Sequence, residues 1–110
     1  MTNHIKLIVL PAKDPAKTKK FLNTYLGTEP YVDGDWYVGY KVGDIEVGID
    51  PNGSAVISYI DTADIESSLK TLKGVGGEVV MGPKDVGGGL LVAQVKIDGN
   101  ILGLRQPAKE

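Results

Sequence analysis

Apolar residues follow two patterns along this chain, short continuous runs and longer stretches with helical spacing. The run at 5–10 is rich in β-branched residues and predicts a strand, which Pro11 ends because proline cannot donate to a sheet ladder. Asp14 and Pro15 then match a helix N-cap followed by proline at the first helical position. We predict a helix from there to Gly27, with apolar positions at Ala16, Phe21, Leu22, Tyr25 and Leu26.

The residues after this helix carry strand patterns. Runs at 36–42 and 45–49 predict two strands joined by the turn-forming pair Gly43-Asp44, and 29–32 predicts a short strand before them. Asp-Pro-Asn-Gly at 50–53 is the strongest turn signal in the chain.

The same order of elements returns after that turn. The sequence predicts a strand at 55–60, a helix from residue 62 or 64 to 73, and strands at 78–81, 90–97 and 101–106. Adding 50 to a residue number carries Leu7 to Ile57 and Asp14 to Asp64, and a final offset of 55 carries Gly48 to Gly103. The predicted class is therefore α+β, with the order βαβββ present twice.

Length places both repeats in one domain. The chain has 110 residues, near the commonest domain size, and divides into module one at 4–50 and module two at 54–107. A module of about 50 residues leaves one face of its sheet bare, so we expect the two to pack together. Paired modules imply a curved mixed sheet around a cavity.

Composition and charge exclude several classes of function. The net charge is −2, which gives no general attraction for nucleic acid or a membrane surface, and no apolar run approaches the roughly 20 residues of a membrane span. There is no cysteine and a single histidine, His4, so thiolate and multi-histidine metal sites are absent. Because the first residues do not match a secretion signal, we expect a cytoplasmic protein.

Three segments carry a family resemblance: VLPAKD at 9–14, FLNTYLG at 21–27 and DGNILGLRQ at 98–106. Together with the repeated βαβββ order, they make the chain similar to the vicinal oxygen chelate superfamily. That group includes glyoxalase I, bleomycin-resistance proteins, fosfomycin-resistance enzymes and extradiol dioxygenases. Its fold serves metal lyases, epimerases, dioxygenases and proteins that only sequester a ligand, so the resemblance leaves the chemistry open.

The resemblance also indicates where metal ligands would stand. Metal-dependent members carry His, Gln or Glu on the first and last strand of each module, which here corresponds to Leu7, Gly48, Ile57 and Gly103. None of these side chains can bind a metal, so we predict no resident metal and no cofactor.

Two enzymatic alternatives stay open. One is a lyase or dioxygenase whose metal uses Glu46 and His4, completed by a partner subunit; the other is a metal-free enzyme with Tyr or Glu as acid or base.

The favoured hypothesis is a protein that binds a small organic molecule in the cavity. Gly48 and Gly103 would leave space there for a ligand, or would instead relieve curvature in the sheet. Tyrosine rings suit planar or cationic ligands, although alternation alone does not decide which face of 36–42 points into the cavity. The predicted ligand-binding residues are Leu7, Tyr40, Gly48, Ile57, Tyr59, Gly103 and Arg105.

Two expectations concern the loops. Glycines in the segment 84–89 lack the pattern of a phosphate loop and predict a mobile hairpin beside the cavity mouth. The short connector at 50–53 favours a homodimer in which modules are exchanged between chains.

Overall fold

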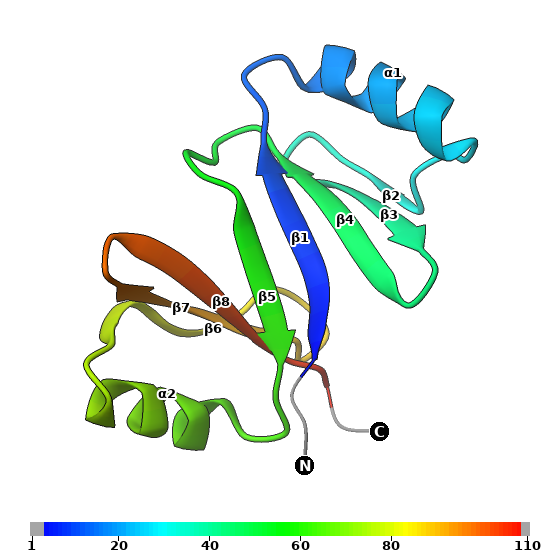
Figure 1. The fold of residues 1–110 in the computed structure, drawn as a ribbon. Helices are drawn as coiled ribbons and strands as arrows, with labels where there is room; N and C mark the ends of the chain where they lie inside the picture. Colours follow the sequence, from blue (N-terminus) through cyan, green and yellow to red (C-terminus); the bar gives the residue numbers. More distant parts are fainter. Residues whose placement is uncertain (1–3, 109–110) are drawn as a thin grey trace. The chain divides into compact units, whose positions relative to one another are not determined.

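The computed structural model describes residues 4–108. The chain divides into two compact units, Lys6–Ile57 and Ser58–Glu110 together with the residues up to Ile5. We keep the names module one for residues 4–50 and module two for residues 54–107, which differ from these units in the assignment of 4–5 and 54–57. Both have the predicted βαβββ order, which confirms the α+β class (Figure 1).

Module one contains five elements, and its strands lie in the order β2-β3-β4-β1. Strand β1 is parallel to β4, while the pairs β2/β3 and β3/β4 are antiparallel. The elements are β1 (Ile5–Pro11), α1 (Pro15–Leu26), β2 (Val32–Asp33), β3 (Val38–Val42) and β4 (Ile45–Asp50).

Both ends of α1 follow from local chemistry. The Asp14 side chain accepts a hydrogen bond from the Lys17 backbone N–H, and Gly27 ends the helix at φ 68°, where its own N–H bonds to the Asn23 carbonyl. Leu22 is the buried helix residue, and it packs with Val38 and Tyr40 in a core that also includes Ala12 and Ile49.

Module two repeats this topology with the strand order β5-β8-β7-β6. Strand β5 is parallel to β8, and the other neighbours are antiparallel. Its core joins Ile65 and Leu69 to Ala93, Val95 and Leu104. The elements are β5 (Ile57–Asp61), α2 (Ile65–Gly74), β6 (Glu78–Asp85), β7 (Leu91–Ile97) and β8 (Asn100–Gln106).

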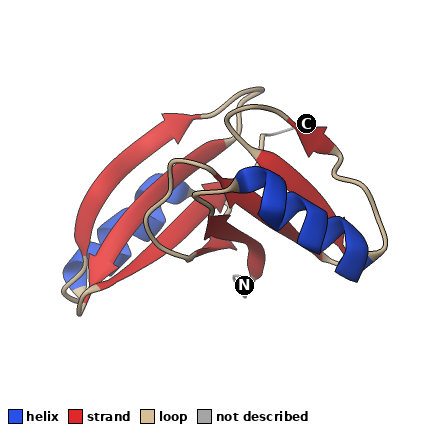
Figure 2. Ribbon diagram, turned by 90° about the horizontal axis from the view of Figure 1, so that it is seen from above, coloured by secondary structure: helices blue, strands red, loops and turns tan. Residues whose placement is uncertain are grey.

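Each helix covers one face of its own module's strands (Figure 2). Because strand side chains alternate, the residues between the core positions lie on the opposite face. We call this the helix-free face of each module. In module one it includes Gly39 and Gly48, since Val38, Tyr40 and Ile49 belong to the core under α1.

Two local expectations need correction. Strand β3 begins at Val38 rather than at residue 36, because the Gly34 N–H bonds to the Tyr37 carbonyl and closes a turn before it. Strand β6 extends to Asp85 rather than residue 81, so a hairpin with Leu91 replaces part of the expected loop.

No helix in the part of the chain from 4 to 108 is long and apolar enough to cross a membrane.

A further correction concerns α1. Phe21 and Tyr25 match the helical spacing of the predicted buried face, yet they are 67% and 82% exposed. Leu22 and the partly buried Leu26 fill the contact with the sheet instead. A second apolar stripe of α1 therefore faces outward.

Candidate functional site

Two glycines lie side by side on the helix-free face of module one. Gly39 on β3 is the register partner of Gly48 on β4, and Val9 on β1 continues the row. Neither glycine has a side chain to cover the backbone, so aromatic rings can approach it closely.

Tyrosine rings occupy that space. A Cβ built at Gly48 would overlap the Tyr37 ring, and one at Gly39 would lie 3.1 Å from Tyr37 Cε2 and 3.3 Å from Tyr31 Cε1. The predicted open volume at Gly48 is therefore filled by a side chain of the same module. Close approach of a ring, rather than an empty chamber, is what glycine permits here.

Charged side chains border these rings. Glu46 on β4 accepts a hydrogen bond from the Tyr31 hydroxyl, and Lys41 Nζ lies 4.8 Å from the centroid of the Tyr31 ring. Lys41 and Glu46 are register partners on adjacent strands, and Leu7 on β1 is the other register partner of Glu46. We call Tyr31, Tyr37, Lys41 and Glu46 the tyrosine cluster.

The tyrosine cluster combines three kinds of recognition chemistry. The face of a tyrosine ring attracts a cation, and here the Lys41 ammonium already uses the Tyr31 ring in this way. Glu46 supplies a carboxylate that is half-buried. Such a site suits a small molecule with a planar or cationic part.

Module two has a corresponding row on its helix-free face. Tyr59 on β5, Gly103 on β8 and Gln94 on β7 are register partners. A Cβ at Gly103 would overlap the Tyr59 ring, whose hydroxyl accepts a 3.0 Å hydrogen bond from Gln94 Nε2. The predicted space at Gly103 is thus filled as well, by a tyrosine that is 8% exposed.

Arg105 is held by a carboxylate from the neighbouring strand. Its Nε donates to Asp61 Oδ1 at 2.7 Å and its Nη2 donates to Asp61 Oδ2 at 3.1 Å, so the pair is bidentate. The side chains are 12% and 24% exposed. Asp61 neutralises much of the positive charge that the sequence assigned to ligand binding.

Tyr40 takes a different place from the one expected. It is fully buried in the core under α1, and its hydroxyl donates to Asn23 Oδ1 at 2.7 Å. Burial raises the pKa of the Tyr40 hydroxyl above its ordinary value, while the nearby Lys19 ammonium acts in the opposite direction. Tyr40 is therefore a core residue under α1 and does not lie on the helix-free face.

The side chains at the four expected ligand positions do not fit the metal of the vicinal oxygen chelate superfamily. Of the four corresponding positions, Leu7 and Ile57 are aliphatic, and Gly48 and Gly103 lie under tyrosine rings. Among residues 4–108 no group of three or more His, Asp or Glu side chains could hold a metal ion. Glu46 instead accepts from Tyr31, and the His4 carbonyl accepts from the Asp61 N–H.

Sequence reasoning left several of these residues out. Tyr31, Tyr37 and Lys41 were not assigned to the site, and Asp61 was not paired with Arg105. The alternation of residues in 36–42 puts Tyr37 and Gly39 on the same side of the chain, which was the available signal.

Comparison with known proteins finds matches by structure and none by sequence. Neither a family model nor a curated protein matches this sequence. Many solved structures share its fold, so the likeness is one of architecture.

Three of these structures illustrate the range. A glyoxalase/bleomycin resistance protein/dioxygenase superfamily member from Vibrio splendidus 12B01 is 17% identical with a TM-score of 0.74, over 96% of this chain and 98% of that one. A hypothetical protein from Bacillus halodurans C-125 is 14% identical with a TM-score of 0.77, over 100% and 98%. A methylmalonyl-CoA epimerase variant from Streptomyces coelicolor, in complex with 2-nitronate-propionyl-CoA, is 15% identical with a TM-score of 0.73, over 99% and 100%.

These matches confirm the predicted resemblance at the level of the fold. The chain has the glyoxalase/bleomycin-resistance fold, and its structural neighbours include both a superfamily member of that name and an epimerase. One fold with several activities leaves the function to be argued from the residues.

Proposed function

We propose that this protein binds a small organic molecule at the helix-free face of module one and uses no resident metal. The tyrosine cluster over Gly39 and Gly48 is the observation that carries the proposal. Two rings offer stacking surface, and Tyr31 is 51% exposed, so a ligand can reach it.

The ligand has a planar group and a positively charged group. The planar group stacks on the tyrosine rings. The positive group competes with Lys41 for the Tyr31 ring and with the Tyr31 hydroxyl for the Glu46 carboxylate. Leu7, the register partner of Glu46, contributes an apolar contact beside it.

Module two carries the other predicted ligand-binding residues. Ile57, Tyr59, Gly103 and Arg105 remain proposed as ligand-binding residues. Support comes from the helix-free face that Tyr59 and Gly103 share and from the ion pair that fixes the Arg105 guanidinium.

Direct binding tests the proposal, and the chain provides its own probe. Trp36 is the single tryptophan, is 81% exposed, and stands next to Tyr37 in the chain. A panel of planar organic molecules, with and without amino groups, is screened by thermal shift, and each hit is titrated by Trp36 fluorescence. We expect Tyr37→Ala to weaken binding about fivefold and Glu46→Gln to weaken the amino compounds selectively.

Two matched variants complete this experiment. Tyr25→Ala removes an exposed tyrosine outside the cluster and should leave the affinity unchanged, whereas Lys41→Met should strengthen binding of amino compounds. Hits whose affinity is the same in Tyr37→Ala and Glu46→Gln as in the parent chain would place the ligand elsewhere. Stoichiometric zinc, nickel or iron in protein purified without chelators would contradict the metal-free part.

We also propose that the protein is a cytoplasmic homodimer. The short connector after β4, where the Gly53 N–H bonds to the Asp50 carbonyl in a turn, supports exchange of modules between chains. Light scattering at micromolar concentration measures the mass. A stable species at the chain mass of 11.7 kDa would contradict the dimer.

A further inference from the structure

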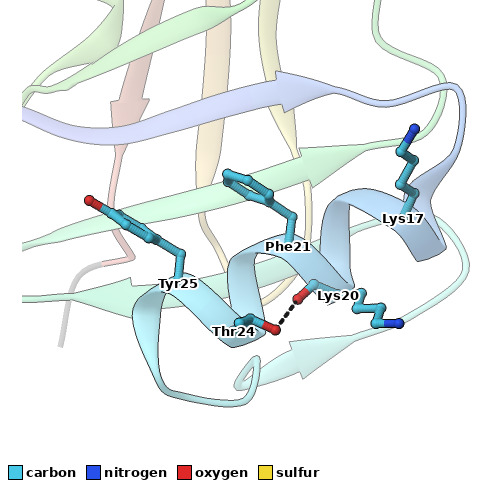
Figure 3. Close-up of a pocket in the computed structure, with 5 residues that line it drawn as sticks. All are labelled: Lys17, Lys20, Phe21, Thr24 and Tyr25. Atoms are coloured by element: carbon cyan, nitrogen blue, oxygen red, sulfur yellow. Dashed lines mark hydrogen bonds between the residues drawn. The ribbon is translucent and has the colours of Figure 1, made fainter.

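The outward stripe of α1 forms a second candidate surface, separate from the tyrosine cluster. Its residues follow the spacing i, i+3, i+4, i+7 and i+8 and line one open pocket (Figure 3). We call this set the α1 surface. It consists of Lys17, Lys20, Phe21, Thr24 and Tyr25.

The two aromatic residues of the α1 surface are not used by the fold. Phe21 and Tyr25 are 67% and 82% exposed, and their rings stack with centroids 6.3 Å apart and planes 20° from parallel. In Figure 3 both side chains rise from the same side of the helix as Lys17. Two neighbouring exposed rings are typical of a contact surface for a partner.

The lysines of the α1 surface are not explained by helix stability. Lys17 stands in the first turn of α1, where the helix dipole disfavours a positive charge, and the last turn has no basic residue. Among the described residues Lys19 pairs with Asp33, but neither Lys17 nor Lys20 forms an ion pair. Pro15–Leu26 contains no Asp or Glu, so Lys17 and Lys20 are two positive charges with no ion-pair partner within residues 4–108.

The equivalent helix of module two lacks this surface. The repeat offset carries Phe21 to Thr71 and Tyr25 to Val75, and α2 has Glu66 in its first turn and Lys73 in its last, as the dipole favours. Lys20 has an equivalent in Lys70, but the exposed aromatic pair and Lys17 are particular to α1 and are not required by the βαβββ architecture.

We propose that the α1 surface binds an acidic segment of a partner protein. An apolar side chain of that segment seats against Phe21 and Tyr25, and its carboxylates face Lys17 and Lys20. Charge complementarity selects this partner, because both charged groups beside the aromatic area, Lys17 and Lys20, are positive.

The same charges disfavour two other occupants. Twofold packing of α1 on a second copy would bring the Lys17 and Lys20 side chains of both copies together with no carboxylate on either helix. An anionic membrane would be approached by a chain of net charge −2 through two aromatic side chains, which is a weak anchor.

The test is an unbiased selection with a displayed library of random twelve-residue peptides against the 110-residue chain. Counter-selection against the Phe21→Ala/Tyr25→Ala variant removes peptides that bind elsewhere on the protein. We expect enriched sequences with Asp or Glu on both sides of an aromatic or aliphatic residue. A synthetic selected peptide should lose at least about tenfold in affinity for Lys17→Gln/Lys20→Gln, and its affinity should fall as salt rises.

Matched controls come from α2 and from the tyrosine cluster. Lys70→Gln/Lys73→Gln removes the same charge from the equivalent helix, and Tyr37→Ala disrupts the proposed small-molecule site; neither should change peptide affinity by more than about twofold. Circular dichroism checks that every variant is folded. If the aromatic variant does not fold, the lysine variant still tests the proposal.

Several outcomes would overturn the inference. Enriched peptides without acidic residues, or peptides that bind the α1 variants as well as the parent, would do so. So would α1-dependent binding to vesicles of phosphatidylserine and phosphatidylcholine. A dimer that dissociates in Phe21→Ala/Tyr25→Ala would assign the surface to a second copy of the chain.

Discussion

Modules one and two carry a glycine at equivalent positions, Gly48 and Gly103, and cover it in different ways. In module two Gly103 is covered by Tyr59 from the adjacent strand β5, and the ring is buried and hydrogen-bonded to Gln94. In module one Gly48 is covered by Tyr37, which stands in the turn before β3 and is only half-buried. Both modules therefore have a tyrosine ring over this glycine, but the tyrosine comes from a different element in each.

The difference separates a packed tyrosine from one available for recognition. Tyr59 is fixed by a strand on one side and by Gln94 on the other, so its displacement would disrupt the sheet of module two. Tyr37 closes a turn that begins at Gly34, stands next to exposed Trp36 and is half-buried, so we expect it to shift with less disturbance. This contrast is why the proposed ligand site is placed in module one.

Truncation of the two tyrosines should give the largest contrast. We expect Tyr59→Ala to lower the free energy of unfolding by about 3 kcal/mol, since it empties a buried site, and Tyr37→Ala to lower it by about 1 kcal/mol. Urea unfolding followed by circular dichroism measures both. Equal losses would remove the distinction between a packed and an accessible tyrosine.

Alanine at the glycines tests the same contrast from the backbone side. Gly103→Ala should destabilise the protein by about 2 kcal/mol, because its Cβ overlaps the fixed Tyr59 ring, and Gly48→Ala by about 1 kcal/mol, because Tyr37 can shift. In the double variant Gly103→Ala/Tyr59→Ala the two losses should be less than additive. Strict additivity in urea unfolding would mean that the ring and the glycine do not interact.

The ion pairs of the two modules should differ in strength. Arg105→Ala should lower the free energy of unfolding by about 1.5 kcal/mol, because it leaves the mostly buried Asp61 carboxylate without its bidentate partner. Lys19 and Asp33 are far more exposed, so Lys19→Ala should have no measurable effect. A double-mutant cycle on each pair isolates the interaction, and similar coupling in both would contradict the expected order.

The smallest expected effect is a pH dependence from the core of module one. Burial raises the pKa of Tyr40 in the folded state, so its contribution is complete below the ordinary tyrosine pKa near 10. As the pH rises above that value the unfolded chain releases the proton first, and the stability falls.

Tyr40→Phe should flatten this alkaline decline, whereas Tyr25→Phe, a change at an exposed tyrosine, should leave it unaltered. Thermal unfolding between pH 8 and pH 11 measures the slopes. Parallel slopes in Tyr40→Phe and the parent chain would show that Tyr40 is not the responsible group.

Much of the fold was predictable because its signals are local. Pro11, the Asp14 cap and Gly27 fixed the end of the first strand and both ends of the first helix, and the numerical repeat placed Gly103 opposite Gly48. These features depend on a few neighbouring residues and on backbone chemistry.

The side-chain arrangement was less predictable because it depends on packing between distant segments. Helical spacing groups Phe21 with Leu22 as apolar positions of the first helix, but only Leu22 is buried against the sheet. Alternation along 36–42 separated Tyr37 from Tyr40 but could not choose which of them lies under α1. That choice follows from the face of the sheet that the helix covers, which is a tertiary property.

The ring over Gly103 also constrains how this protein can evolve. A carboxylate acquired at that position would collide with Tyr59, so the substitution is accessible only after Tyr59 has become smaller. Shrinking Tyr59 first, however, empties a buried site and lowers stability before any benefit arises. The two changes are therefore epistatic, and a chain that has filled the glycine gap with tyrosine is separated by a barrier of lowered stability from one that carries a carboxylate at this position.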